Sequence, residues 1–162
     1  VGAVETILAN PQVTCDFICD GIHVDPMAVK AALAAKGAEG VSLITDASFG
    51  AGLPPGTYET PWGYPVEVKP GNAPRIADPE HVYFGALAGS ALTMNRGMAN
   101  LLRWLDLPEE QVWSLGTRSP AKVLRFAGRG HLVAGMAADV VLWDDGEDLT
   151  AAATWVNGHK VF

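Results

Sequence analysis

Two short apolar runs in the first part of the chain end in polar side chains. Residues 13–19 are apolar and β-prone and lead into Asp20-Gly21-Ile22-His23, and residues 41–45 form a second run that ends in Asp46. A helical pattern lies between them. Strand–helix alternation predicts a parallel sheet with right-handed crossovers, and α/β barrels place their functional groups at the carboxyl ends of such strands. Asp46 and the Asp20–His23 segment are therefore the first candidates for a site.

Helical signals occur at several places along the chain. Apolar residues at three- and four-residue steps predict helices over residues 1–10 and over residues 90–105, the second with Ser90 as its cap. Asp25-Pro26 predicts the start of the helix between the two apolar runs, and Gly37 predicts its end in a left-handed C-cap. Further helices are expected to begin at Pro108 and at Ser119-Pro120.

The remaining apolar and β-branched stretches predict antiparallel structure. Residues 53–74 are rich in Pro and Gly around two β-prone stretches, which predicts a hairpin inserted after the second strand. Residues 138–143 read as a buried strand, and residues 155–161 read as a hairpin with a favoured Asn157-Gly158 turn. The chain is therefore expected to end in β-structure from residue 130.

Composition narrows the class of protein. The 162 residues are 49% hydrophobic, enough for a packed core, and carry a net charge of -7 with 11 scattered basic residues. Nucleic acid is excluded as a partner on that ground. The chain has neither a membrane-length apolar run nor a leader pattern, so we expect a cytoplasmic protein without membrane contact. Cys15 and Cys19 are expected to be reduced thiols.

The predicted strand–helix units are too few for a complete barrel. An eight-fold α/β barrel takes about 250 residues. We therefore expect this chain to be a fragment, or one half of a structure that another chain completes.

Six segments in a fixed order carry a resemblance to a known family. They are Asp20-Gly21-Ile22-His23-Val24-Asp25, Leu43-Ile44-Thr45-Asp46-Ala47, Leu87-Ala88-Gly89-Ser90-Ala91-Leu92-Thr93-Met94, Ser119-Pro120-Ala121, Gly135-Met136-Ala137-Ala138-Asp139-Val140-Val141-Leu142 and Thr154-Trp155-Val156-Asn157-Gly158. Together they resemble the C-terminal half of the N-acetylglucosamine-6-phosphate deacetylases, which belong to the amidohydrolase superfamily. The resemblance spans nearly the whole chain.

The resemblance implies a fold and a division of the chain. The α/β fold would be a distorted (β/α)8 barrel plus a small β-sandwich domain built from both chain termini. Residues 1–129 would supply the last two βα units of the barrel, with the hairpin insertion near 53–74, and residues 130–162 would supply a segment of the small β-domain.

The resemblance also implies roles for particular residues. Asp46 would be the catalytic acid/base that takes a proton from a metal-activated water and delivers it to the leaving amine. His23 would hydrogen-bond the substrate near the scissile amide, where a neutral imidazole can donate to a carbonyl oxygen. Asp20, Gly21 and Ile22 would belong to the same substrate-binding turn, and Leu87, Ala88 and Gly89 would lie against the sugar.

Each of these residues also has a plainer interpretation. An Asp at a strand–loop junction is often a turn former or a cap, and His23 can lie in a polar turn without a ligand. Gly89 can serve as the turn before the helix that Ser90 caps. Asp25 is better explained as a helix cap and is left out of the site.

The implied reaction is hydrolysis of N-acetylglucosamine 6-phosphate to glucosamine 6-phosphate and acetate with a divalent metal ion, zinc or iron. The family's metal ligands, a Glu and two His, would lie upstream, so no metal ligand is expected in this chain. Partners would be the amino-sugar phosphate and either a complementary N-terminal chain or further copies of this one. Two alternatives stay open: an amidohydrolase for a different amide, and an inactive fragment that needs a complementary chain.

Overall fold

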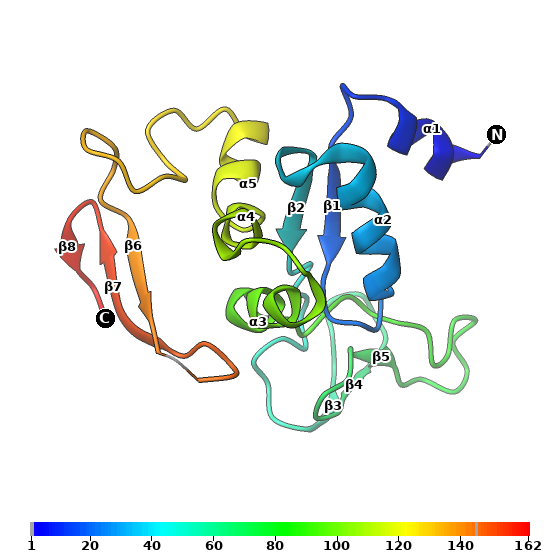
Figure 1. Ribbon diagram of the computed structural model, residues 1–162. Helices are drawn as coiled ribbons and strands as arrows, with labels where there is room; N and C mark the ends of the chain where they lie inside the picture. Colours follow the sequence, from blue (N-terminus) through cyan, green and yellow to red (C-terminus); the bar gives the residue numbers. More distant parts are fainter. Residues whose placement is uncertain (1, 145) are drawn as a thin grey trace.

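The computed structural model describes residues 2–144 and 146–162. Strands β1 (Cys15–Ile18) and β2 (Val41–Ile44) form a parallel pair in which Ile18 lies opposite Ile44. The α-helix α2 (Pro26–Lys36) and the short 3-10 helix η1 (Ala38–Gly40) connect them. The predicted strand–helix–strand unit is confirmed, and Figure 1 shows both strands pointing the same way.

Helix α2 begins and ends at the predicted residues, with one difference in geometry. Asp25 is the N-cap, and its Oδ1 accepts a hydrogen bond of 2.8 Å from the N–H of Met27. Gly37 donates its N–H to the Leu33 carbonyl at φ 68°, but its ψ of 172° is not the predicted left-handed helical value. The reason is that Gly37 is also the N-cap of η1, so the backbone must leave one helix and enter the next at once.

The predicted helix over residues 1–10 is present as α1 (Ala3–Ala9), while Val1 lies outside the described residues. Three more helices follow the insertion: α3 (Met94–Trp104), α4 (Glu109–Ser114) and α5 (Arg118–Val123). They pack with α2 around β2, and the buried side chains of this core include Val29, Leu43, Leu101, Val112 and Leu115. The N–H of Leu43 donates to the Leu115 carbonyl at 2.8 Å, so β2 is tied to the end of α4.

Helix α3 starts later than predicted, and Ser90 does not cap it. Thr93 is the N-cap of α3, whereas the Ser90 hydroxyl accepts the N–H of Leu92 within an extended segment. The cause is a bridge between Ala47 and Ser90 that holds this segment beside the chain leaving β2. A contact over more than 40 residues of sequence, which helical periodicity does not register, therefore decides where α3 begins.

The insertion after β2 is an antiparallel sheet of β3 (Gly56–Tyr58), β4 (Val66–Val68) and β5 (Arg75–Ile76). The predicted hairpin is β3 and β4, and β5 adds a third strand just beyond the predicted range. Figure 1 shows this insert sheet on the side toward which β1 and β2 point. The insertion therefore faces the strand ends.

The last part of the chain is a meander of β6 (Val140–Trp143), β7 (Ala151–Val156) and β8 (His159–Lys160). Its final turn is at Asn157 and Gly158, whose φ values of 49° and 80° match the predicted Asn-Gly hairpin. The expectation that β6 is a buried strand is wrong, because Val141 and Leu142 are 39% and 55% exposed. In Figure 1 this sheet lies beside the helices, on the side away from β1, and the Trp143 ring of β6 stacks on the Trp113 ring of α4 at a centroid distance of 6.4 Å.

None of the helices formed by the described residues has the length and apolar character that a membrane crossing requires.

Candidate functional site

The turn that follows β1 is organised by one carboxylate. Asp20 Oδ1 accepts hydrogen bonds from the backbone N–H groups of Ile22 and His23, at 2.8 and 2.9 Å. Its Oδ2 lies 2.7 Å from Nδ1 of His23. The Asp20 side chain is only 8% exposed and that of His23 is 15% exposed. The two side chains form a partly buried pair at the end of the strand.

The electrostatics of the turn favour an ionised Asp20. Burial alone would raise the pKa of the Asp20 carboxyl, but the hydrogen bonds from His23 and Ile22 and the nearby His23 ring hold it below its ordinary value. An ionised carboxylate can only accept hydrogen bonds, so Nδ1 of His23 must carry the proton between them. A neutral ring protonated at Nδ1 has a lone pair at Nε2.

Helix α3 holds this turn in place. The side-chain amide of Asn100 donates to the Cys19 carbonyl at 2.8 Å. Gly21 has a φ of 75°, and a Cβ at that position would lie 3.4 Å from the Trp104 ring. A glycine is required there because the backbone is left-handed and also passes close to the indole.

Asp46 lies directly after β2 with an exposed side chain and an unusual backbone. Its φ of 46° is in the left-handed region, which Asp and Asn adopt more readily than other residues with side chains. The Ser90 N–H donates to the Asp46 carbonyl at 3.0 Å, and the Ser48 N–H donates to the Ser90 carbonyl at the same distance. These two bonds hold the Asp46 backbone in place while its carboxylate reaches solvent.

The predicted Leu87-Ala88-Gly89 segment is brought against the chain around Asp46. The Ser48 hydroxyl donates to the Ala88 carbonyl at 2.7 Å. Gly89 has a φ of 74°, and a Cβ there would lie 2.4 Å from Cβ of Ser48. The close approach that the sequence suggested for Gly89 is therefore an approach to the protein's own Ser48 side chain.

Both polar segments leave the same edge of the β1–β2 pair, because Ile18 and Ile44 are opposite each other in a parallel register. The structure thus brings Leu87–Gly89 directly to the Asp46 segment and places the Asp20–His23 turn at the neighbouring strand end. The insert sheet and α3 flank this edge (Figure 1).

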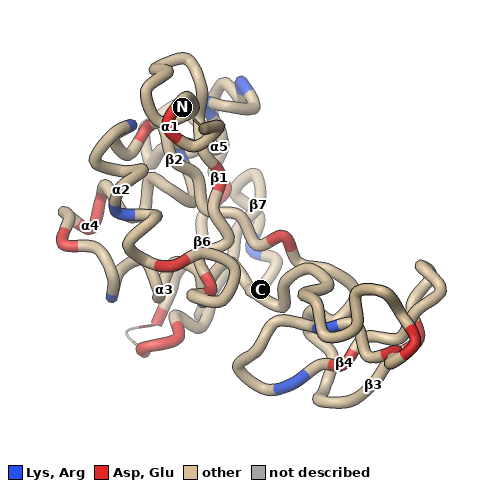
Figure 2. Tube along the Cα trace, turned by 90° about the vertical axis from the view of Figure 1, so that its right-hand side faces the viewer, with Lys and Arg blue, Asp and Glu red and all other residues tan. Residues whose placement is uncertain are grey.

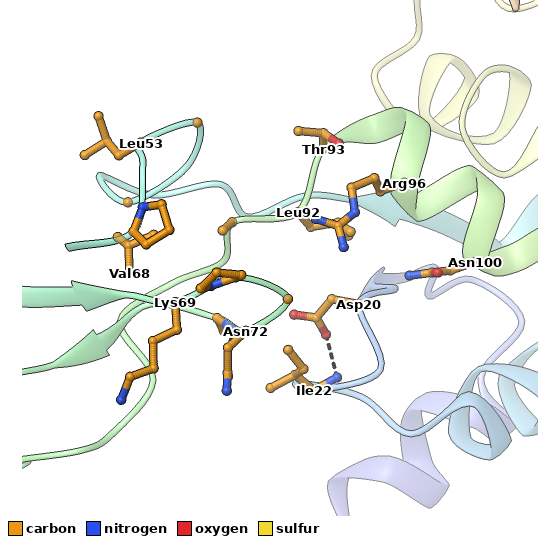
Figure 3. Close-up of a pocket in the computed structure, with 17 residues that line it drawn as sticks. Asp20, Ile22, Leu53, Val68, Lys69, Asn72, Leu92, Thr93, Arg96 and Asn100 are labelled. Atoms are coloured by element: carbon orange, nitrogen blue, oxygen red, sulfur yellow. Dashed lines mark hydrogen bonds between the residues drawn. The ribbon is translucent and has the colours of Figure 1, made fainter. Parts of the chain in front are cut away.

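A cavity of about 360 Å³ lies behind the turn, between the insertion and α3. Figure 3 shows Arg96 and Asn100 reaching from α3 toward the side of the cavity where Asp20 lies, with Lys69 and Asn72 on the insertion side. Sequence reasoning missed Lys69, Asn72 and Arg96, since no motif connects the insertion to α3. Neither His23 nor Asp46 lines this cavity.

The distribution of charged residues and the available metal ligands bear on what this part of the chain can bind. Figure 2 shows Lys and Arg positions separated along the described chain, with Asp and Glu positions between them. Within residues 2–144 and 146–162, no group of three His, Cys, Asp or Glu side chains is placed to hold a metal ion. The residues described here do not fit a divalent metal by themselves.

No protein-family profile matches the chain. Among proteins of known name, it is 36% identical to the N-acetylglucosamine-6-phosphate deacetylase of Vibrio furnissii over 162 residues, covering 99% of this chain and 38% of the relative. It is 34% identical to the enzyme of that name from Bacillus subtilis, covering 87% of this chain and 34% of the relative. The chain thus spans little more than a third of these relatives.

A relative that the chain nearly spans comes from Escherichia coli strain K12 and is provisionally named N-acetylgalactosamine-6-phosphate deacetylase. Identity is 32% over 160 residues, with 98% of this chain and 89% of the relative covered. Among solved structures, the N-acetylglucosamine-6-phosphate deacetylase of Thermotoga maritima matches all of this chain with 42% of its own, at 32% identity and a TM-score of 0.84. The Mycobacterium smegmatis D267A mutant, solved with N-acetyl-D-glucosamine-6-phosphate, matches at 28% identity and 0.82.

Proposed function

Since the chain belongs to the N-acetylglucosamine-6-phosphate deacetylase family, we propose that the complete protein removes the acetyl group from N-acetylglucosamine 6-phosphate. The products are glucosamine 6-phosphate and acetate. One observation carries the proposal: Asp46 and the Asp20–His23 turn leave the same edge of a parallel strand pair, where α/β enzymes gather catalytic groups. The names of the relatives supply the substrate class.

In this proposal Asp46 is the catalytic residue and handles the proton. An exposed carboxylate at a strand end can take a proton from the attacking water at one of its Oδ atoms. It can then deliver that proton to the amide nitrogen as the carbon–nitrogen bond breaks, which releases acetate and the free amine. The Ser90 N–H donates to the Asp46 carbonyl and the Ser48 N–H donates to the Ser90 carbonyl, which fixes the Asp46 backbone, so little movement is needed between the two steps.

Asp20, Gly21, Ile22 and His23 are proposed to bind the substrate as one turn, and Leu87, Ala88 and Gly89 to form the wall beside Asp46. The hydrogen-bond network inside each segment supports these roles, because a substrate-binding surface needs a rigid frame. Asp20 and Ile22 of this turn also line the cavity beside Lys69 and Arg96.

The family is generally metal-dependent, and we propose a zinc or iron ion for the complete protein. Its ligands are expected outside this chain, because the described residues do not form a metal site. In that arrangement this chain contributes the acid/base and the turn, and not the metal centre.

The mixed α/β fold supports a finer proposal about architecture. We assign residues 1–129 to the last two βα units of a (β/α)8 barrel, with the insertion near 53–74, and residues 130–162 to part of a small β-sandwich domain. The parallel β1–β2 pair with its α2 crossover supports the first assignment. The separate β6–β8 meander supports the second.

The same architecture implies partners. A two-stranded parallel pair and a half-exposed meander leave surfaces for a complementary N-terminal segment or for further copies of the chain. We place the complete protein in the cytoplasm, where phosphorylated sugars are metabolised. The nearly equal length of the Escherichia coli K12 relative supports a second candidate function. In this alternative, a chain of this size is inactive until a complementary chain supplies the metal site.

The test combines this chain with its upstream half, or uses the full-length protein, and measures acetate release from N-acetylglucosamine 6-phosphate. Asp46→Asn should lower kcat by about 10²- to 10⁴-fold, since the acid/base is lost while Asn tolerates the left-handed backbone. Asp106→Asn, at an exposed position after α3, is the matched control and should leave kcat unchanged.

Three outcomes would contradict parts of the proposal. Activity that survives Asp46→Asn removes Asp46 from its role. Turnover of other N-acyl compounds with none of the phosphorylated sugar would mean an amidohydrolase for a different amide. If the 162-residue chain alone binds a metal ion stoichiometrically and catalyses deacetylation, the expectation that its metal ligands lie upstream is wrong.

A further inference from the structure

Within the part of the chain that the structure describes, Nδ1 is the ring nitrogen of His23 that has a hydrogen-bond partner. Nδ1 is engaged by Asp20 Oδ2 at 2.7 Å, so contact with anything outside the turn falls to Nε2. The side chain is 15% exposed, which leaves the ring edge accessible but prevents it from turning freely. A ligand that contacts the ring therefore meets Nε2, either as an N–H donor or as a lone-pair acceptor.

The carboxylate of Asp20 is largely used by its own turn. It accepts three hydrogen bonds, two from backbone N–H groups and one from the His23 ring, out of about four acceptor positions that a carboxylate offers. With 8% of its side chain exposed, it has little surface left for a substrate. Asp20 is therefore better suited to orienting His23 than to contacting a sugar.

The turn itself is braced against rotation. Asn100 binds the Cys19 carbonyl before it, and the Trp104 ring lies against Gly21 within it. The two backbone donors to Asp20 Oδ1 fix the carboxylate plane, and this plane fixes the ring. Asp20 therefore orients the His23 ring and leaves Nε2 available to a ligand. Hydrogen-bonded carboxylates set histidine tautomers in this way in other enzymes.

We propose that Asp20 is a positioning residue that holds His23 in the Nδ1–H tautomer, so that Nε2 of the neutral ring acts as a hydrogen-bond acceptor. The partner of such an acceptor is a hydroxyl or N–H donor of the ligand, and not the carbonyl oxygen of the scissile amide. For an amino sugar, a ring hydroxyl or the amide N–H has the required chemistry. This choice of ligand atom rests on the proposed function, whereas the tautomer does not.

Asp20→Asn is the informative substitution. Its single side-chain oxygen can keep accepting from Ile22 and His23, while its NH₂ group faces Nδ1 and can only donate to it. The ring must then carry its proton on Nε2, which inverts the hydrogen-bonding character of the outward-facing nitrogen. Asp25→Asn is the matched control, because Asp25 caps α2 two residues after His23, has no hydrogen bond to the ring, and Asn is an equally good cap.

The first readout is the ring ¹⁵N spectrum of the histidine-labelled chain, which contains four histidines, with His23→Gln used to assign the signals. We expect Nδ1 protonated and Nε2 unprotonated in the neutral ring of the wild type and of Asp25→Asn, and the reverse in Asp20→Asn. The second readout is the kinetics of the full-length protein. KM should rise about 10- to 100-fold in Asp20→Asn with kcat largely retained, because the lost contact is made equally in the ground state and the transition state.

A wild-type ring protonated on Nε2, or an unchanged tautomer in Asp20→Asn, would overturn the proposal. The circular dichroism and urea midpoint of Asp20→Asn are measured alongside, and inverted tautomers in a folded chain would support it regardless of activity. If the tautomers behave as expected but the full-length protein does not deacetylate the sugar phosphate, the proposed function fails and the positioning role stands. If deacetylation is intact and KM does not move despite an inverted tautomer, the assigned ligand contact is wrong.

Discussion

Replacing Gly89 by alanine tests the link that fixes Asp46. Gly89 lies in the segment whose Ser90 binds the Asp46 carbonyl, and two features require glycine at this position. The φ of 74° is in the left-handed region, and a Cβ would lie 2.4 Å from Cβ and 2.5 Å from Oγ of Ser48. The substitution therefore adds both backbone strain and a collision.

The two costs can be estimated separately. A left-handed conformation costs a residue with a side chain roughly 1–2 kcal/mol. Overpacking by one carbon against a fixed neighbour costs typically about 1–3 kcal/mol more. Gly52→Ala is the matched control, because Gly52 has a φ of 77° but, among the described residues other than its chain neighbours, no atom within 4 Å of its Cβ position. It should cost only the backbone part, so Gly89→Ala should exceed it by about 1–3 kcal/mol.

The assay is urea unfolding followed by circular dichroism, with the free energy of unfolding compared at constant m-value. Ser48→Gly removes both atoms that the new Cβ would meet, so in that background Gly89→Ala should cost no more than Gly52→Ala. Equal costs for Gly89→Ala and Gly52→Ala in the unaltered chain would refute the reasoning. They would show that Ser48 does not lie against Gly89, and the frame assigned to Asp46 would then be incorrect.

Two further predictions concern the turn after β1. The pKa of Asp20 is lowered in the folded chain, so its contribution to stability is present above the unfolded pKa and is lost as the pH falls through the folded pKa. The free energy of unfolding in urea of the wild type, relative to that of Asp20→Asn, should therefore decline between about pH 5 and pH 3. A parallel decline in both proteins would contradict this prediction. Burial, together with the charge of Asp20, raises the pKa of Cys19 to about 12, and Cys19 is 1% exposed. A thiol reagent should accordingly label Cys15 in the native chain and reach Cys19 only in urea, with Cys15→Ser as the control; native labelling of Cys15→Ser would count against this.

Local patterns in the sequence were sufficient for the elements whose stabilising contacts are local. The N-cap at Asp25, the Asn157-Gly158 turn and the parallel β1–β2 unit all follow from short motifs and are present in the structure. The start of α3 was misplaced because residues 87–92 are held by the chain beyond β2, through bonds between residues some 40 positions apart. The exposure of β6 was misjudged for a similar reason, since an apolar strand does not reveal what covers it.

The candidate site divides in the same way. Asp46, Asp20 and His23 could be selected because each follows an apolar strand and belongs to a recognisable motif. The contact between Nδ1 of His23 and the Asp20 carboxylate could not be predicted, because three-residue spacing does not determine which ring nitrogen faces the carboxylate. Lys69 and Arg96 were missed because they line one cavity only through the folding of the insertion beside α3.

Helix α3 determines how the two halves of the site lie relative to each other. Its later residues hold the first half, through Asn100 at the Cys19 carbonyl and Trp104 over Gly21. The helix begins just after the Ser90 segment that fixes Asp46. Gly97 lets the helix pack on Leu43 of β2, because a Cβ at position 97 would lie 2.8 Å from a Leu43 methyl group. Strand pairing sets the spacing of β1 and β2, but α3 contacts the exit of both. A tilt of this helix would therefore move His23 and Asp46 together, so a half-buried helix that supplies no catalytic group is expected to matter to the chemistry of the site.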